Sequence, residues 1–147
     1  MSTPPPINVV SYDAEERSMA ALSHASILLN LFIPGLGIIA AAAVWLTQNE
    51  RSPFARKQAL QAAVFQTVWL LLPIVVAVVG VMTAVGGAIA GSLTDARVGV
   101  LLIPAVVFGV LAVLGVILLG ILYALVGAYE TYQGRDFRYW IVGKLVH

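Results

Sequence analysis

One histidine, His24, is the only side chain that titrates near neutral pH within three long stretches that lack Asp, Glu, Lys and Arg. These stretches are residues 18–49, 58–94 and 98–129. An imidazole inside such a stretch can ligate haem or a chlorin, or it can relay protons. It can also be a neutral ring that hydrogen-bonds to a neighbouring helix. We favour this structural role, because the only other histidine is the last residue, His147.

Two sets of polar side chains follow helical spacing in the same stretches. Ser23, Ser26 and Asn30 fall within about 60° of one another on a helix, at 100° per residue. Gln58 and Gln61 lie on one face of a later helix. Polar side chains in lipid need partners, so we expect these five residues to form a polar intramembrane cluster that joins two helices. The alternative is a polar cleft for a ligand. Asn30, Gln58 and Gln61 are also the expected partners of His24.

The motifs of catalysis do not occur in the sequence. It has no Cys, which excludes disulfides and thiol catalysis, and it has no HExxH, GxSxG or Walker motif. No pair of carboxylates falls inside the charge-free stretches. We therefore expect a protein that is not an enzyme, that has no metal site, and that carries no cofactor unless His24 binds one.

The composition predicts an integral membrane protein. Hydrophobic residues make up 61% of the 147 residues and charged residues 10%, against about 25% charged in soluble domains. Apolar runs of about 18 residues or more are typical of membrane-spanning helices. This pattern excludes a water-soluble enzyme, a secreted disulfide scaffold and a nucleic-acid-binding domain. The expected fold class is all-α and polytopic, in the cell inner (plasma) membrane.

The first charge-free stretch is too long for one span, and it contains Pro34-Gly35. These residues favour a break, so we expect two short helices, at about 14–32 and 36–48, joined there. Asp13 and Glu16 form a capping box before the first of them.

Two longer helices are expected in the rest of the chain. Ser52-Pro53 predicts a helix start, and that helix runs to about Gly91 with bends at Pro73 or Gly86-Gly87. The last helix is expected over about 95–132, with Gly134 as its stop.

The distribution of Lys and Arg predicts the orientation. With four spans, one side holds seven basic residues and the other holds only Arg97. With three spans the division is six against two, so four transmembrane helices with both termini cytoplasmic fit better. We expect a flexible Pro-rich tail at 1–12, a four-helix transmembrane domain at 13–134, and an interfacial C-terminal segment at 135–147.

An ordered set of residues resembles a known family. The markers are Glu16-Arg17, Ala20, Leu22, His24, Pro34-Gly35, Trp45, Ser52-Pro53-Phe54, Arg56-Lys57-Gln58-Ala59, Gln61-Ala62, Phe65-Gln66, Ala128, Tyr132, Gly134, Phe137-Arg138-Tyr139 and Gly143. Over about residues 13–145 the chain is similar to small bacterial membrane proteins of uncharacterised function. These are distantly similar to the Tic-type import component of the chloroplast inner envelope. The resemblance implies a four-helix membrane domain and supplies no reaction. Trp140 stands where the family often has Pro, and Arg56 where His is common.

Three functions are consistent with these features. The first is a non-enzymatic accessory or structural subunit that packs within a larger membrane complex, with the lipid bilayer and other membrane subunits as partners and no nucleic acid. Glycine-rich helices without intramembrane charge favour it. The second is a channel or protein-translocon component, as the resemblance implies. The third is a cofactor-binding membrane protein that uses His24.

Overall fold

Four helices make up the computed structural model, which describes residues 11–94, 98–140 and 142–144. They are α1 (Ala14–Ala25), α2 (Leu36–Thr47), α3 (Pro53–Thr94) and α4 (Val98–Tyr132), with short 3-10 segments η1 (Ser26–Leu31) and η2 (Val142–Lys144). No strand occurs within these described ranges, so the all-α prediction is confirmed. The expected tail at 1–12 lies outside the described residues except for Ser11 and Tyr12.

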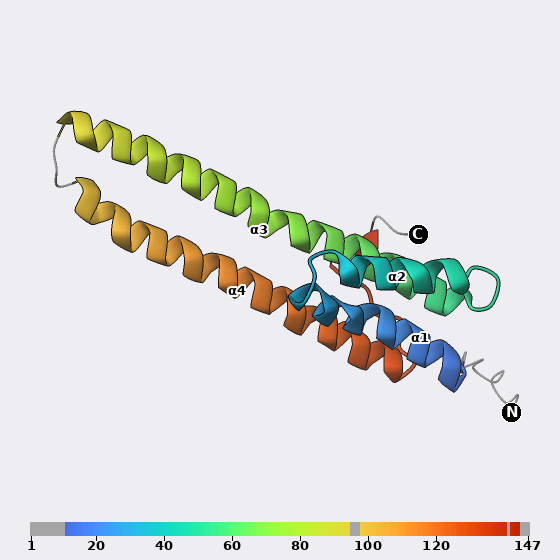
Figure 1. The fold of residues 1–147 in the computed structure, drawn as a ribbon. Coiled ribbons are helices and arrows are strands. Elements are labelled where there is room, and N and C mark those ends of the chain that lie inside the picture. The colour runs from blue at the N-terminus through green and yellow to red at the C-terminus, as the bar shows by residue number, and fades with distance from the viewer. Residues whose placement is uncertain (1–10, 95–97, 141, 145–147) are drawn as a thin grey trace, which may run out of the picture.

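The helices α3 and α4 form a long antiparallel hairpin, and α1 and α2 cover only one end of it (Figure 1). α1 packs against both long helices, whereas α2 packs mainly against α3. The covered end contains the start of α3 and the end of α4, and we call it the base of the hairpin. The other half of α3 and α4 has no neighbouring helix in the structure.

Local sequence signals set the helix ends as expected. The Asp13 carboxylate accepts a hydrogen bond from the Glu16 amide at 2.7 Å, and Glu16 accepts one from the Asp13 amide at 3.0 Å. The Ser52 hydroxyl accepts a hydrogen bond from the Ala55 amide at 3.1 Å. Gly134, with φ of +80°, follows the end of α4. These contacts confirm the capping box, the helix start at Ser52-Pro53 and the stop at Gly134.

The break between α1 and α2 is also where the sequence predicts it. Gly35 has φ of +91° and precedes the first residue of α2. The first α-helix is shorter than the expected 14–32, because the backbone changes after Ala25 from an α-helix to the 3-10 helix η1. By contrast, Pro73 and Gly86-Gly87 lie inside α3 and do not interrupt it.

Among the residues that the structure describes, two helices are long and apolar enough to cross a membrane, over Pro53–Gly91 and Pro104–Tyr132. Most large apolar side chains of their far half are exposed, as expected of a surface that faces lipid. α2 is apolar but has 12 residues, or about 18 Å of helix, against about 30 Å of hydrocarbon. The fold is thus that of a membrane protein in which, of the described helices, α3 and α4 have the length of full spans.

The hydrophobic core lies at the base, between η1, α3, α4 and the C-terminal segment. Its buried members are Ile27, Phe65, Ala124, Tyr139 and Val142. Tyr139 and Val142 belong to the segment that we expect at the membrane interface. Its described part returns to the bundle and buries these two side chains, while Trp140 remains 77% exposed. The interfacial placement of residues 135–147 stays a prediction.

Candidate functional site

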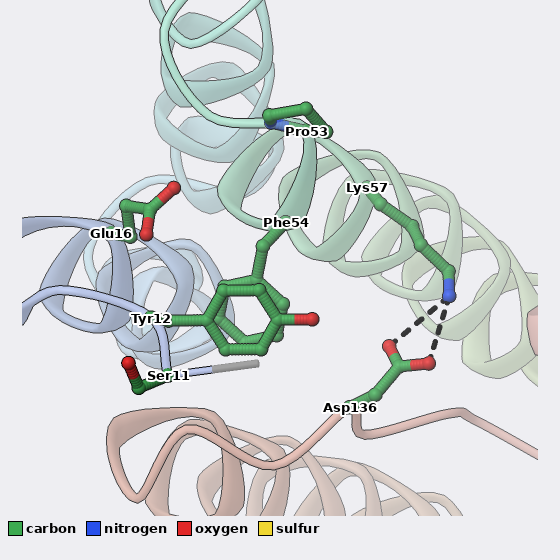
Figure 2. Close-up of a pocket in the computed structure, with 7 residues that line it drawn as sticks. All are labelled: Ser11, Tyr12, Glu16, Pro53, Phe54, Lys57 and Asp136. Carbon is green, nitrogen blue, oxygen red and sulfur yellow. Dashed lines mark hydrogen bonds and ion pairs between the residues drawn. The ribbon is translucent and has the colours of Figure 1, made fainter. Parts of the chain in front are cut away.

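An open pocket of about 470 Å³ lies at the charged end of the base (Figure 2). The rings of Tyr12 and Phe54 stack in it with centroids 3.8 Å apart. Lys57 and Asp136 form an ion pair at its edge, with Lys57 Nζ 2.9 Å from Asp136 Oδ2. Ser11, Glu16 and Pro53 complete the lining. None of these residues was expected as a site residue from the sequence.

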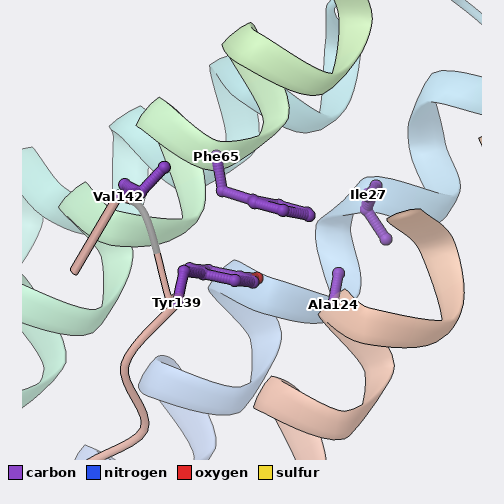
Figure 3. Packing of buried hydrophobic residues seen from close by; sticks show 5 residues of the cluster. All are labelled: Ile27, Phe65, Ala124, Tyr139 and Val142. Atoms are coloured by element: carbon purple, nitrogen blue, oxygen red, sulfur yellow. The ribbon is translucent and has the colours of Figure 1, made fainter. Parts of the chain in front are cut away.

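The Tyr139 ring lies in the hydrophobic core, facing Phe65 (Figure 3). It stacks on Phe65 with centroids 3.9 Å apart and planes 2° apart. Burial raises the pKa of the Tyr139 hydroxyl, so this group stays a neutral hydrogen-bond donor. The C-terminal segment is therefore held inside the bundle by an aromatic stack that also places a hydroxyl in the core.

The Tyr139 hydroxyl forms a hydrogen bond with the imidazole of His24. The His24 ring is fully buried, with Nδ1 2.8 Å from Tyr139 Oη and Nε2 3.0 Å from Gln58 Oε1. The Gln58 amide is oriented by its nitrogen, which donates to Asp136 Oδ1 at 2.9 Å and to the Phe137 carbonyl at 3.1 Å. Gln58 Oε1 can only accept, so the His24 proton is assigned to Nε2 and Tyr139 donates to Nδ1.

A continuous chain of hydrogen bonds thus runs from the core to the surface. Tyr139 donates to His24, His24 donates to Gln58, and Gln58 donates to Asp136. Partial burial raises the pKa of Asp136, but hydrogen bonds from Lys57 and Arg138 outweigh it, and the net pKa is lowered. This series of hydrogen bonds therefore ends at the Asp136 carboxylate, which is charged at neutral pH.

The His24 site also depends on a close approach by α4. A Cβ atom added at Gly127 would lie 2.8 Å from Phe137 Cε1 and 3.2 Å from His24 Nδ1. The Phe137 ring meets the His24 ring edge-on, with centroids 5.6 Å apart. A glycine at this position lets α4 and the C-terminal segment close over the imidazole.

Ser23, Ser26 and Asn30 form a polar stripe along α1 and η1. This stripe contacts Gln66 of α3, which was not expected as a site residue from the sequence. Gln66 Nε2 donates to the Ser26 hydroxyl at 3.0 Å and to the Ser23 carbonyl at 3.1 Å. Gln66 Oε1 accepts from the Asn30 amide at 3.2 Å. Gln66 is one of three glutamines in the charge-free part of α3, and that property could have identified it.

Gln61 does not take part in either group. Its side chain is fully buried, yet neither amide atom has a hydrogen-bond partner among the described residues. The expected pairing of Gln61 with Ser23, Ser26 and Asn30 is therefore wrong, and Gln66 has that role. The expected cluster divides into two parts, one around His24 and Gln58 and one around Gln66.

This geometry limits what His24 can do as a ligand. Both ring nitrogens already have side-chain partners within 3.0 Å. A metal or haem iron bound to either nitrogen would have to replace one of those hydrogen bonds. Across the described part of the chain, no group of three or more His, Cys, Asp or Glu residues is placed to hold a metal ion.

Comparison with known proteins identifies a family. No curated protein and no solved structure matches the chain. The model of the magnetosome magnetite crystal formation protein family matches residues 15–146, which is nearly the whole chain. The expected likeness to a small bacterial membrane family is thus met, whereas no similarity to the Tic-type component is found. The chain belongs to the magnetosome magnetite crystal formation protein family.

Proposed function

We propose that the chain is a non-enzymatic membrane protein that takes part in magnetite crystal formation as an accessory or structural subunit of a membrane complex. The family match over residues 15–146 carries this proposal. The protein would act from the membrane next to the growing crystal. The membrane itself is either the plasma membrane, as expected from the sequence, or the magnetosome membrane that the family name implies.

The organisation of the base supports a structural role. Buried side chains from α1, α3 and the C-terminal segment satisfy one another through His24, Gln58 and Tyr139. Such networks fix one arrangement of helices and leave few polar groups free for chemistry. The occupied ring nitrogens of His24 favour this role over cofactor binding.

The far half of the hairpin supports the proposed partners, which are the lipid bilayer and other membrane subunits. Large apolar side chains of α3 and α4 are exposed there, for example Val79, Met82, Phe108 and Leu111. Added Cβ atoms at Gly80, Gly86, Gly109 and Gly115 would meet no atom within 4 Å. Small residues on a lipid-facing surface allow another helix to approach closely.

For topology we propose that both termini are cytoplasmic. This placement puts seven basic residues on the cytoplasmic side and only Arg97 on the other side, as the positive-inside rule favours. Four crossings would produce this arrangement. It would also arise if α1 and α2 entered and left the membrane on the same face and only α3 and α4 crossed it. A channel or translocon component is the alternative function, but its basis was the resemblance to the Tic-type component, which the comparisons do not find.

The test of function is complementation in a magnetite-forming bacterium whose own family member has been deleted. Expression of this chain should restore crystal size and shape in electron micrographs, and an empty vector should not. Immunoblots of separated plasma and magnetosome membranes would show where the chain resides. A chain that is present at normal levels in membranes but leaves the crystals unchanged would refute the proposal.

A second experiment tests the subunit role. Purification in a gentle detergent followed by mass spectrometry should recover a reproducible set of other membrane proteins with the chain. Recovery of the chain alone, after cross-linking in the membrane, would contradict the accessory-subunit proposal.

A further inference from the structure

The turn between η1 and α2 is apolar and exposed. Its sequence, residues 31–36, is Leu-Phe-Ile-Pro-Gly-Leu and has no polar side chain. Leu31, Phe32 and Ile33 are 62%, 81% and 59% exposed. A turn that emerged into water would place three large apolar side chains against solvent, at a cost of about 25 cal/mol for each Å². These side chains fit lipid acyl chains instead.

The backbone of the same turn is satisfied from within the protein. Asn30 Oδ1 accepts from the Gly35 amide at 3.1 Å and from the Gly37 amide at 2.9 Å. The Ser26 hydroxyl donates to the Gly37 carbonyl at 2.9 Å. The amides of Phe32 and Ile33 both donate to the Leu29 carbonyl. Irregular backbone persists at membrane depth only where such internal partners exist, so this turn meets the requirement for a position inside the bilayer.

The depth of the turn follows from its contact with α3. Gln66 holds Asn30, and an added Cβ atom at Gly37 would collide with the Gln66 side chain. Gln66 lies nine residues beyond Lys57, the last charged residue before the apolar part of α3. Nine residues of helix measure about 14 Å, which is about half of the 30 Å hydrocarbon layer.

The part of α3 beyond Gln66 is long enough to reach the other side of the bilayer without contacts to α1 and α2. It continues from Gln66 to Thr94, a further 28 residues or about 42 Å of helix. This length exceeds the remaining half of the bilayer. By contrast, α2 has only 12 residues, or about 18 Å of helix, which is enough to lead from mid-depth back to the charged end but not to cross the whole layer.

We propose that α1, η1 and α2 form a re-entrant hairpin, which enters the membrane from the charged end and turns back within the hydrocarbon at residues 31–36. The surface of the turn is covered by lipid acyl chains. Only α3 and α4 cross the bilayer. Two spans and a re-entrant hairpin keep the basic residues divided as in the four-span arrangement, so the distribution of charge does not distinguish the two.

Cysteine labelling tests this proposal directly, because the natural chain has no Cys. Ile33→Cys places a thiol at the exposed turn, and Asn49→Cys is the matched control in the exposed connection between α2 and α3. A membrane-impermeant maleimide is applied to right-side-out and inverted membrane vesicles. Asn49→Cys should react from one side only. Ile33→Cys should react from neither side, and both should react after detergent is added.

Two labelling results would overturn the proposal. Reaction of Ile33→Cys from the face opposite to Asn49→Cys would mean that α1 and α2 cross the bilayer, as in the four-span model. Reaction from the same face as Asn49→Cys would mean that the hairpin lies outside the hydrocarbon.

Protection alone could arise from a protein neighbour, so a depth measurement accompanies the labelling. Phe32→Cys carrying a bimane fluorophore is reconstituted in vesicles with nitroxide lipids spin-labelled near the headgroup or deep in the acyl chain. The deep nitroxide should quench the fluorescence more strongly than the shallow one. Stronger quenching by the shallow nitroxide, or no quenching by either, would overturn the proposal.

Discussion

The His24 imidazole and the Tyr139 hydroxyl are 115 residues apart in the chain, and their atoms Nδ1 and Oη lie 2.8 Å apart. This contact joins the first helix to the segment that follows the last one. Because Tyr139 also stacks on Phe65 of α3, one side chain connects α1 and α3 to the C-terminal segment. The base is thus closed by the end of the chain as well as by its helices.

Removal of the Tyr139 hydroxyl should loosen this closure. In Tyr139→Phe the aromatic stack remains, but Nδ1 of His24 loses its donor and is left unsatisfied in the core. We expect a destabilisation on the order of 1 kcal/mol, measured as a lower melting temperature in detergent. Tyr132→Phe is the matched control, because Tyr132 is exposed. Equal melting temperatures for the two variants would show that the hydrogen bond does not contribute.

Two glutamines of the same helix provide a second matched pair. Gln66 makes three hydrogen bonds to the α1–η1 stripe, whereas Gln61 makes none among the described residues. Gln66→Leu should destabilise the protein by about 1 kcal/mol or more, because it leaves several buried groups unpaired. Gln61→Leu should be neutral or stabilising, because it removes an unsatisfied amide. A greater loss of stability in Gln61→Leu would mean that its amide has a partner in the membrane.

The two glutamines also show what sequence periodicity can predict. Spacing at 100° per residue places polar side chains on helix faces, and in the structure α1 and α3 do contact each other through His24 and Gln58. The spacing did not predict that Gln66 rather than Gln61 faces the stripe. That choice depends on how the two helices are rotated and crossed, and neither helix encodes this alone.

Helix ends were predicted well because their causes are local. Asp13 with Glu16, Ser52 with Pro53, and Gly134 each act within four residues. From the sequence, Tyr139 is only a marker of the family resemblance and a member of the segment 135–147 that is expected at the interface. Its insertion next to His24 is a long-range contact, and composition gives no indication of it.

Stability in acid should depend on Asp136. Its pKa is lowered in the folded protein from the ordinary value of 3.8, since ion pairs outweigh the effect of burial. A lowered folded-state pKa contributes stability that is present above about pH 4 and is lost as the pH falls through the folded-state value. The melting temperature in detergent should therefore decrease when the pH is lowered below about 4. In Asp136→Asn the melting temperature should depend less on pH in this range. An unchanged acid profile in this variant would assign the loss to other carboxylates.

Two glycines of α4 should respond differently to the same substitution. Gly127→Ala adds a Cβ atom 2.8 Å from Phe137 and 3.2 Å from His24, so one of these rings must move. We expect a destabilisation of about 1–3 kcal/mol, the range for overpacking a closely packed core. Gly109→Ala meets no atom within 4 Å and should leave the melting temperature of the detergent-solubilised chain unchanged or raise it. The reverse order would contradict the packing around His24.

The last prediction separates structure from chemistry at His24. His24→Gln keeps one donor and one acceptor in the core, so it can retain hydrogen bonds to Tyr139 and Gln58, but it is a much poorer metal ligand. We expect the variant to fold, to insert into membranes and, in the complementation test, to restore magnetite crystals to the same extent as the natural chain. The absorption spectra of the two purified proteins should be the same. A pigment present in the natural protein and lost from a folded His24→Gln variant would show that His24 is a ligand. His24→Leu should be less stable than His24→Gln, because it leaves the Tyr139 hydroxyl and the Gln58 carbonyl oxygen unpaired in the core.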